Sequence, residues 1–402
     1  MGSNWVQAWG QAHSALSFFY YPSCKKTFRL VMNTAVSGEK LRVVFSNKCG
    51  KNDVVVGAVT ASPCDSEGNY DCDEYAVLTV GGATGFTLKK GENVASDETD
   101  FRVGIGGYFC ISVYVERGDL TSGNLLSNVN LITAKGNRTA ERCLSNEPRT
   151  RDSVRKVACQ VLGMFLHKPI PLFESVELFN SENARSIVVF GDSLSQQGFW
   201  TNAFDKRIRD AYPGRYSVIN KSIMGNRILR DYSPRFICKG LFGESGLSRI
   251  KDDIYPFPDV EYVIFNLGIN DFLQYGTITT PKSEKPDPDE LCAAVNRLTL
   301  ELQAHGIKVV MLTYIGFGAC ADYRDEKEVL RKQVNTWLRE NKNLFDAFYD
   351  QDEVCRDPQK DNFTRLEYLG ADKLHPNEAG GQLIADSLDI GIFAQKQDES
   401  FA

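Results

Sequence analysis

Residues 1–182 alternate between short apolar runs and clusters of Gly, Asn, Asp and Ser. The runs are rich in β-branched and aromatic residues, which is typical of short strands separated by turns. They cover 27–32, 40–45, 54–59, 76–80 and 108–115. Long helical periodicity is absent before Arg149. This pattern predicts an all-β sandwich or jelly roll with two packed sheets.

From Arg185 onward, apolar strand patterns alternate with helical ones, which is typical of a doubly wound parallel sheet. After a first strand at 186–190, strands are expected at 216–219, 262–266, 307–313 and 344–349, and helices at 199–212, 289–305, 326–340 and 377–389. The stretch 181–184 is polar and without periodicity, as linkers are. We therefore expect an α/β domain over 183–402, preceded by a β-sandwich domain over 1–182.

The composition is that of a soluble globular protein, with 42% hydrophobic and 24% charged residues. A net charge of −6 and the lack of a basic cluster exclude nucleic acid as an expected partner. No apolar run reaches membrane-spanning length, so no membrane span is expected. Without a visible secretory signal, we expect a cytoplasmic protein, and secretion stays open if a signal preceding this sequence was removed.

The 11 cysteines are scattered, with no Cys-x-x-Cys pair, and the chain has only 4 histidines. Zinc needs clustered ligands, so we expect neither a metal site nor another cofactor. Cys64 and Cys72 flank an acidic loop and could form a local disulfide in an oxidising compartment. Isolated buried thiols in a reducing cytoplasm fit the scattered spacing better.

A candidate nucleophile follows the first strand of the second domain. Gly191 permits a tight turn there, and Asp192 and Ser193 stand where a helix should begin. A serine on this strand-to-helix turn lies at the carboxyl edge of the sheet, where open α/β folds bind ligands. Backbone N–H groups meet there and can stabilise an oxyanion. The plainer alternative is a serine that only caps the helix.

Three further stretches end near predicted strand termini. Gly225 follows the second strand and lets a backbone N–H approach a ligand, whereas Asn270 follows the third and offers an amide donor. Asp372 and His375 precede the last helix. Parallel topology brings such strand ends to one edge of the sheet. These residues are therefore expected to converge on Ser193.

Chemistry explains this set of residues. A serine hydroxyl needs a base within hydrogen-bond reach, and His375 can accept its proton and return it to the leaving alcohol. Asp372 can orient the imidazole and stabilise its protonated form. The N–H groups of Ser193 and Gly225 and the amide of Asn270 would supply an oxyanion hole. Protonation of His375 should stop the reaction at acid pH.

The chain resembles the SGNH, or GDSL-type, hydrolase superfamily. The blocks Gly191-Asp192-Ser193-Leu194, Gly225, Gly268-Ile269-Asn270-Asp271 and Asp372-x-x-His375 occur in the order of that family. The resemblance implies a flavodoxin-like sheet and metal-free ester hydrolysis through an acyl-enzyme. Less specifically, 5–9 and 41–47 are similar to the N-terminal β-domain of some bacterial two-domain members. The segment 277–287 lies outside the shared blocks and leaves the pocket shape open.

Residues beside these blocks are candidates for supporting or substrate-lining roles. Asp192, Asp271 and Asn226 are expected to support the site, although Asp271 could be only a turn residue. Nearby aromatic side chains could stack on sugar rings or line an acyl pocket, or could simply pack in the core. They are Phe199, Trp200, Tyr232, Phe272 and Tyr275.

The expected substrate is a small-molecule or oligosaccharide ester. The family analogy favours deacetylation of O-acetylated carbohydrate. Lysophospholipase or short-chain lipid esterase activity is the alternative, against which the lack of an amphipathic membrane-binding helix counts mildly. A non-catalytic carbohydrate-binding protein is the alternative of another class, but pure binding would need none of Ser193, Asp372 and His375.

Overall fold

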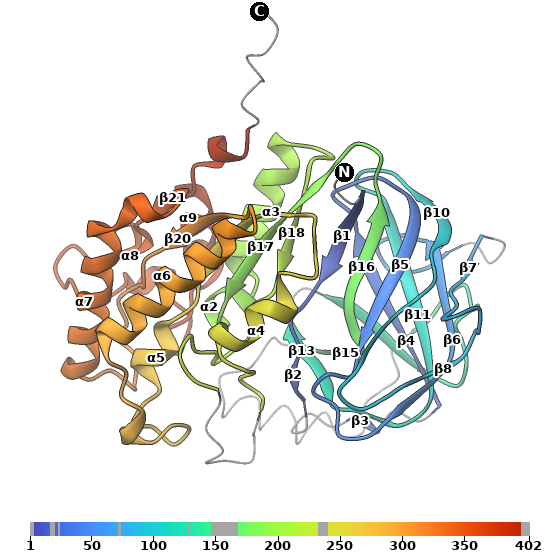
Figure 1. Cartoon of the computed structure of the whole chain (residues 1–402), viewed down its shortest axis with the longest axis horizontal. Coiled ribbons are helices and arrows are strands. Elements are labelled where there is room, and N and C mark those ends of the chain that lie inside the picture. The colour runs from blue at the N-terminus through green and yellow to red at the C-terminus, as the bar shows by residue number, and fades with distance from the viewer. Residues whose placement is uncertain are drawn as a thin grey trace, which may run out of the picture.

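The computed structural model describes residues 4–16, 21–22, 25–70, 74–126, 129–145, 168–231 and 240–394. The first part of the chain is an antiparallel β-sandwich (Figure 1). One sheet has the order β1 (Trp5–Gly10), β16 (Phe173–Phe179), β5 (Gly38–Ser46) and β10 (Thr99–Val103), with β9 (Asn93–Ala95) on β5. The other has the order β14 (Asn130–Lys135), β4 (Lys26–Asn33), β11 (Tyr108–Arg117), β6 (Val54–Pro63) and β7 (Ala76–Val77), with β8 (Phe86–Leu88) on β6. The predicted all-β domain is therefore confirmed.

Alternating residues of these strands form the core of the sandwich. Phe28, Leu30 and Ile111 from one sheet and Val43 and Phe45 from the other are fully buried in one hydrophobic cluster. Smaller sheets lie at one end of the sandwich. They comprise β12 (Asp119–Leu120) with β3 (Tyr21–Pro22), and β15 (Lys168–Pro171), β13 (Ser122–Leu126) and β2 (Ser14–Ala15). Strand β13 of this second group contacts the second part of the chain, because Asn124 Nδ2 donates to the carbonyl of Ser222 at 2.9 Å.

The second part of the chain is a parallel sheet. Its order is β18 (Tyr216–Asn220), β17 (Arg185–Gly191), β19 (Val260–Asn266), β20 (Lys308–Leu312) and β21 (Ala347–Tyr349). The first strand in sequence thus lies between the second and the third, which is the flavodoxin-like order that the resemblance implied. The interior strands are almost wholly apolar, because helices cover both faces.

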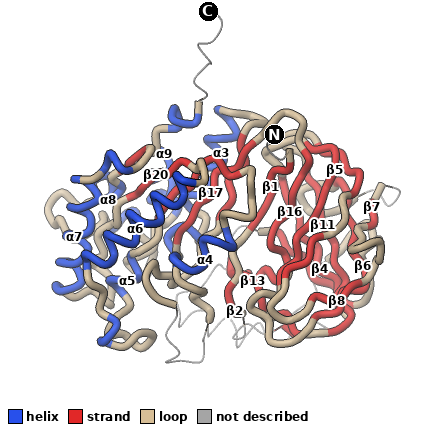
Figure 2. The backbone as a smooth tube through the Cα atoms, viewed as in Figure 1, coloured by secondary structure: helices blue, strands red, loops and turns tan. Residues whose placement is uncertain are grey.

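Right-handed crossovers fix which helices cover each face. Along the sheet, the step from β17 to β18 runs in one direction, and the steps from β18 through β19 and β20 to β21 run in the opposite direction. The helix α3 (Phe199–Ala211), which joins β17 to β18, therefore lies on one face, where α9 (Glu378–Ser387) packs against it. The helices α4 (Gly246–Asp253), α6 (Pro288–Ala304) and α7 (Asp325–Glu340) lie on the other face (Figure 2). In the described part of the chain, no helix has both the length and the apolar character needed to cross a membrane.

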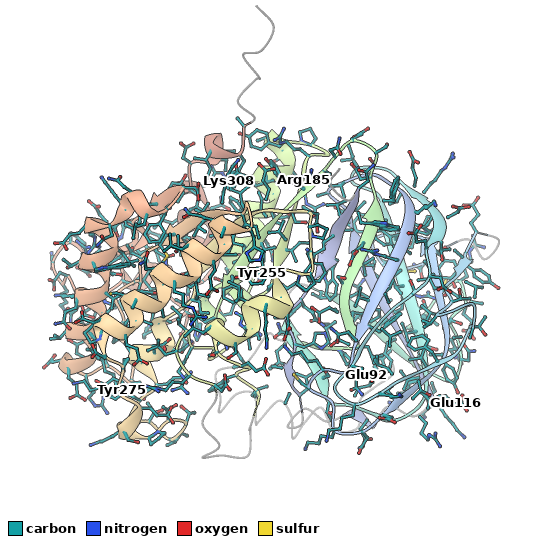
Figure 3. All side chains as sticks on the ribbon, in the orientation of Figure 1. Glu92, Glu116, Arg185, Tyr255, Tyr275 and Lys308 are labelled. Atoms are coloured by element: carbon teal, nitrogen blue, oxygen red, sulfur yellow. The ribbon has the colours of Figure 1, made fainter. Side chains whose placement is uncertain are left out.

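The strands of this sheet all begin on one side and end on the other. Arg185 and Lys308, which begin β17 and β20, mark the amino ends of the strands. Tyr275, which follows α5 (Ile269–Leu273), lies beyond their carboxyl ends (Figure 3). The short helix α2 (Ser193–Gln196) follows β17 at this carboxyl edge. The site predicted from the sequence is therefore at the lower edge of the sheet in Figure 1.

The sandwich packs against the edge strand of the parallel sheet, with β1 beside β18. Polar contacts line this boundary. Lys221 Nζ, fully buried, donates to Glu174 Oε1 at 2.9 Å and to the carbonyl of Gln11 at 3.0 Å. Antiparallel pairing ends at Phe179 and parallel pairing begins at Arg185. We propose the domain boundary between them, after residue 182.

Candidate active site

Ser193 is the first residue of α2, directly after the turn that ends β17. Asp192 caps this helix, because its Oδ1 accepts the Leu194 N–H at 3.0 Å. The Ser193 side chain is therefore held at the carboxyl edge of the sheet, where it is partly exposed. Among the described residues, the Ser193 N–H has no protein acceptor. The hydroxyl and the backbone N–H of Ser193 therefore lie at the same turn, where both can interact with a substrate.

His375 and Asp372 meet Ser193 although 182 residues separate the histidine from the serine. His375 Nε2 lies 2.8 Å from Ser193 Oγ, and His375 Nδ1 lies 2.6 Å from Asp372 Oδ2. The side chains of His375 and Asp372 are 18% and 36% exposed. The three groups therefore form one hydrogen-bonded line that is open to solvent, in the order that general-base activation of a hydroxyl requires.

The loop before α9 fixes the carboxylate of Asp372. Its Oδ1 accepts the N–H groups of Leu374 and His375, each at 3.0 Å. Burial alone would raise the pKa of Asp372, but the hydrogen bond and charge of His375 and these two N–H donors lower it to about 2. The carboxylate is therefore ionised at neutral pH and faces the imidazole.

Gly225 lies in the loop after β18 and adopts a φ of 68°, which favours glycine. A Cβ there would lie 2.5 Å from the ring of Phe242, so no larger residue fits. Gln274 Nε2 donates to the carbonyl of Gly225 at 2.8 Å, and the Ile223 N–H donates to the carbonyl of Gly191 at 3.1 Å. These bonds hold the Gly225 loop against the turn that carries Ser193.

Asn270 stands in the first turn of α5 and is only 6% exposed. Its Nδ2 donates to the carbonyl of Asn226 at 3.1 Å, which places the amide beside the Gly225 loop. Gly268, with a φ of 137°, precedes it, and a Cβ there would lie 2.4 Å from Tyr314 Oη. The structure thus brings Asn270 and Gly225 together at the sheet edge that also carries Ser193.

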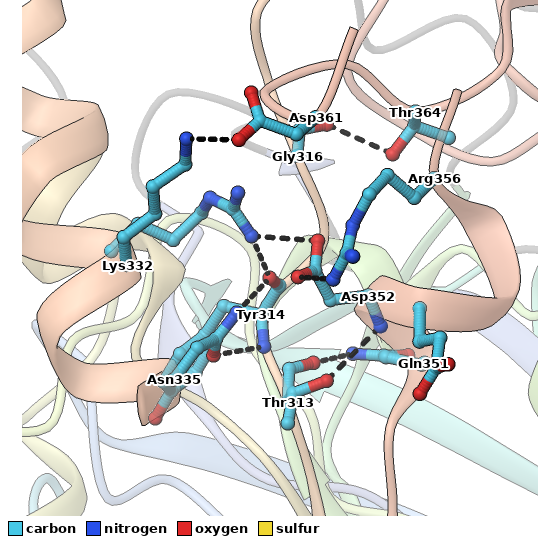
Figure 4. Close-up of polar contacts among 12 residues, drawn as sticks. Thr313, Tyr314, Gly316, Lys332, Asn335, Gln351, Asp352, Arg356, Asp361 and Thr364 are labelled. Atoms are coloured by element: carbon cyan, nitrogen blue, oxygen red, sulfur yellow. Dashed lines mark hydrogen bonds and ion pairs between the residues drawn. The ribbon is translucent and has the colours of Figure 1, made fainter. Parts of the chain in front are cut away.

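The loop of Asn270 rests on a buried polar network that the sequence did not reveal. Gln351 Nε2 donates to Asn266 Oδ1 at 2.9 Å and also to the carbonyl of Thr313, while Asn266 Nδ2 donates to Ser195 Oγ at 3.1 Å. Figure 4 shows how the Asp352 N–H donates to Thr313 Oγ1, at 3.0 Å, so that the ends of neighbouring strands are joined. These bonds tie the carboxyl ends of the strands that carry the site to one another.

Asp192, Asp271 and Asn226 support the backbone of the site. Asp271 accepts the N–H groups of Ile228 and Leu229 at 2.8 and 3.1 Å, so it organises the chain after Gly225. Asn226 is 1% exposed and its Nδ2 donates to the carbonyls of Phe242 and Glu244. Burial raises the pKa of Asp192 to about 7 and that of Asp271 to about 6.

Asp192→Asn should reduce the loss of folding stability that occurs as the pH rises. Because the folded-state pKa is raised from 3.8 to about 7, the folded protein binds more protons than the unfolded one in this window, and stability is lost as pH rises through it. The Asn oxygen keeps the cap. As the pH rises from about 5 to about 8, the wild type should lose about 2–3 kcal/mol of its free energy of unfolding that the variant does not lose. Urea unfolding at several pH values measures this difference.

Asp210→Asn is the matched control for this prediction. Asp210 is exposed on α3, where it pairs with Lys206, so its neutralisation should leave the pH dependence of unfolding as in wild type. Parallel stability curves for Asp192→Asn and Asp210→Asn would contradict the effect of burial on Asp192.

Three of the aromatic residues considered as substrate contacts are buried. Trp200 is wrong as a substrate contact, because its side chain is 0% exposed and packs with Phe204 in the core beneath α3. Phe272 and Tyr275 are likewise buried, at 0% and 4% exposure. Tyr232 lies outside the described residues. Apolar burial thus outweighs sequence proximity to the site for these aromatic side chains.

The described residues contain no group of three or more His, Cys, Asp or Glu side chains that could hold a metal ion. Cys64 is a free thiol, and the residue considered as its partner, Cys72, lies outside the described ranges. The proposed Cys64–Cys72 disulfide therefore stays untested.

A parallel α/β sheet with a serine, an imidazole and a carboxylate in one line at its carboxyl edge defines the class of serine hydrolases. Residues 189–383 match the model of the GDSL-like lipase/acylhydrolase family. This part of the chain is a GDSL-like acylhydrolase domain, and the protein is an ester hydrolase.

Solved structures with similar folds include an acetylxylan esterase from Geobacillus stearothermophilus, with 18% identity, a TM-score of 0.38, and 50% of this chain and 91% of that chain covered. A GDSL-like lipase from Bacteroides thetaiotaomicron is 14% identical with a TM-score of 0.36, over 61% of this chain and 98% of that one. An α/β hydrolase from the metagenome of Lake Arreo, Spain, is 16% identical with a TM-score of 0.38, over 51% and 94%. No curated protein matches the chain.

Proposed function

We propose that the protein removes acetyl groups from O-acetylated carbohydrate, with Ser193 as nucleophile. The observation that carries the hydrolytic step is the 2.8 Å contact between Ser193 Oγ and His375 Nε2. In the acylation step, Ser193 Oγ attacks the ester carbonyl while His375 takes its proton. Collapse of the tetrahedral intermediate breaks the ester bond, and His375 protonates the departing sugar oxygen.

Water then completes the cycle. His375 accepts a proton from a water molecule as the water oxygen attacks the acetyl carbonyl, and returns it to Ser193 Oγ as acetate leaves. Asp372 stabilises the imidazolium in each half of the reaction. The negative charge on the carbonyl oxygen is met by the N–H groups of Ser193 and Gly225 and by the Asn270 amide.

The side chains around the proposed oxyanion-hole donors favour a substrate with a short acyl group. The ring of Phe242 packs closely against Gly225, and Tyr314 Oη packs against Gly268, so these side chains fill the space next to the two glycines. The partly exposed His375 and Asp372 fit a shallow site that an acyl group on a bulky saccharide can reach. Long acyl chains need a deep apolar channel instead.

Acetate release from acetylated xylan, acetylated mannan and small acetylated sugars tests this proposal, together with a panel of p-nitrophenyl esters from acetyl to octanoyl. We expect acetate release and the highest kcat/KM on the acetyl ester. An octanoyl optimum with no acetate release from any saccharide would overturn the acetyl-carbohydrate assignment and favour a lipid ester. Absence of hydrolysis on every ester, by folded protein, would favour a binding protein.

A further inference from the structure

Asn124 of the sandwich domain is hydrogen-bonded to the part of the hydrolase domain that carries the candidate active site. Asn124 lies on β13 and is 0% exposed. Its Nδ2 donates to the carbonyl of Ser222 at 2.9 Å, and its Oδ1 accepts from Gln196 Nε2 at 2.6 Å. A single side-chain amide thus bonds two separate segments of the hydrolase domain.

These two segments carry the backbone donors of the proposed oxyanion hole. Gln196 is the last residue of α2, the one-turn helix that Ser193 begins. Ser222 is fully buried and precedes Gly225 in the same loop. The Asn124 amide therefore links α2, which carries the Ser193 N–H, to the loop after β18, which carries the Gly225 N–H.

The strand behind Asn124 is itself firmly held. Asn124 pairs with Ile170 across β13 and β15, and the Leu125 N–H donates to Asn124 Oδ1 at 2.8 Å, which fixes the amide orientation. Gln196 depends on this contact more than Asn124 does. Its Oε1 is buried without a partner among the described residues, so the bond to Asn124 is the one side-chain hydrogen bond it makes there.

We propose that Asn124 is a positioning residue for ester hydrolysis: the sandwich domain sets the spacing of the two backbone N–H donors. This inference rests on the proposed roles of Ser193 and Gly225. Donors that are fixed in advance stabilise the oxyanion without reorganisation, and small displacements of a reacting group reduce rates steeply. Loss of the Asn124 amide frees Gln196 and Ser222 to move independently.

Asn124→Ala, with Asn33→Ala as the matched control, tests this role. Asn33 also belongs to the sandwich and accepts Arg209 Nη1 at 2.9 Å, so its bond crosses the same boundary to α3 instead of to α2 or the Gly225 loop. The measurements are kcat and KM for p-nitrophenyl acetate and the Ki of phenylboronic acid, whose tetrahedral adduct with serine mimics the intermediate. Burst titration gives the concentration of active sites.

For Asn124→Ala we expect kcat per active site to fall about 10- to 100-fold and the Ki of the boronate to rise by a similar factor, with KM nearly unchanged. Asn33→Ala should keep all three values. Gln196→Met removes the same bond from its other end and should reproduce the effect. The double variant Asn124→Ala/Gln196→Met should then be no worse than either single variant.

The outcomes separate this inference from the proposed function. If Ser193→Ala is as active as wild type, the serine mechanism itself fails. If Ser193→Ala is inactive but Asn124→Ala and Gln196→Met match Asn33→Ala per active site, only the positioning role is overturned. A reduced burst amplitude with an unchanged boronate Ki would likewise overturn it, because Asn124 would then support folding alone.

Discussion

Ser193→Ala should lower kcat for p-nitrophenyl acetate by at least about 10⁴-fold, and His375→Ala should have a comparable effect. The reason is the contact of 2.8 Å between Ser193 Oγ and His375 Nε2, without which neither an acyl-enzyme nor a proton transfer to the leaving alcohol can form. Because the two residues act as a unit, the double variant should be hardly slower than either single variant. Initial rates with enzyme quantified by absorbance provide the measurement.

His305→Ala is the matched control for the histidine. His305 stacks on Tyr255 and its Nδ1 contacts the carbonyl of Glu301, far in sequence from the site blocks. This variant should keep wild-type kcat. Equal rates for wild type and Ser193→Ala would eliminate a serine mechanism, whereas equal losses for His305→Ala and His375→Ala would show that folding, rather than proton transfer, was lost.

The architecture of the second domain could be predicted because its signals are local. Each buried strand is a short apolar run, and the helix expected at 289–305 is α6, which begins one residue earlier at Pro288 because Asp287 caps it and proline suits the first helical position. The last strand was placed at 344–349, but β21 begins only at Ala347, because residues 342–344 form a 3₁₀ turn after α7. Helix ends and strand starts depend on such tertiary details.

The sandwich shows the same division. The four longest strands, β4, β5, β6 and β11, were predicted, but 76–80 shortens to the two-residue strand β7, and Val80 instead pairs with Ala83 across the turn at Gly81 and Gly82. The N–H groups of these glycines donate to Asp97 at 3.0 and 2.8 Å, and that partner lies in another part of the sequence. Propensity describes a residue's neighbours along the chain, not its partners across it.

The site residues could be predicted because glycine, asparagine and the Asp-x-x-His spacing carry local chemical meaning at strand ends. The residues behind them could not. Asn124 contacts Gln196 and Ser222 across 72 and 98 positions, and no periodicity or spacing in β13 distinguishes it from any other polar strand residue. Trp200 was misplaced for the converse reason, since a hydrophobic side chain near a catalytic block is still governed by core packing.

Asn270→Ala should lower kcat about 10²- to 10³-fold while leaving KM nearly unchanged, because its amide would act on the charge that develops only in the transition state. The amide nitrogen has two hydrogens. One is used in the bond to the carbonyl of Asn226, at 3.1 Å, which orients the group, and the other is available for the oxyanion. Steady-state kinetics on p-nitrophenyl acetate, normalised by burst titration, measure the loss.

Asn341→Ala is the control for this prediction, because Asn341 caps the end of α7 by donating to the carbonyl of Trp337 at 2.8 Å and takes no part in the site. It should keep wild-type kcat. A rise in KM at constant kcat for Asn270→Ala would mean that the amide binds the ground state instead of the oxyanion. An unchanged kcat/KM would leave the N–H groups of Ser193 and Gly225 as the proposed donors, and the Asn270 amide would then serve the fold alone.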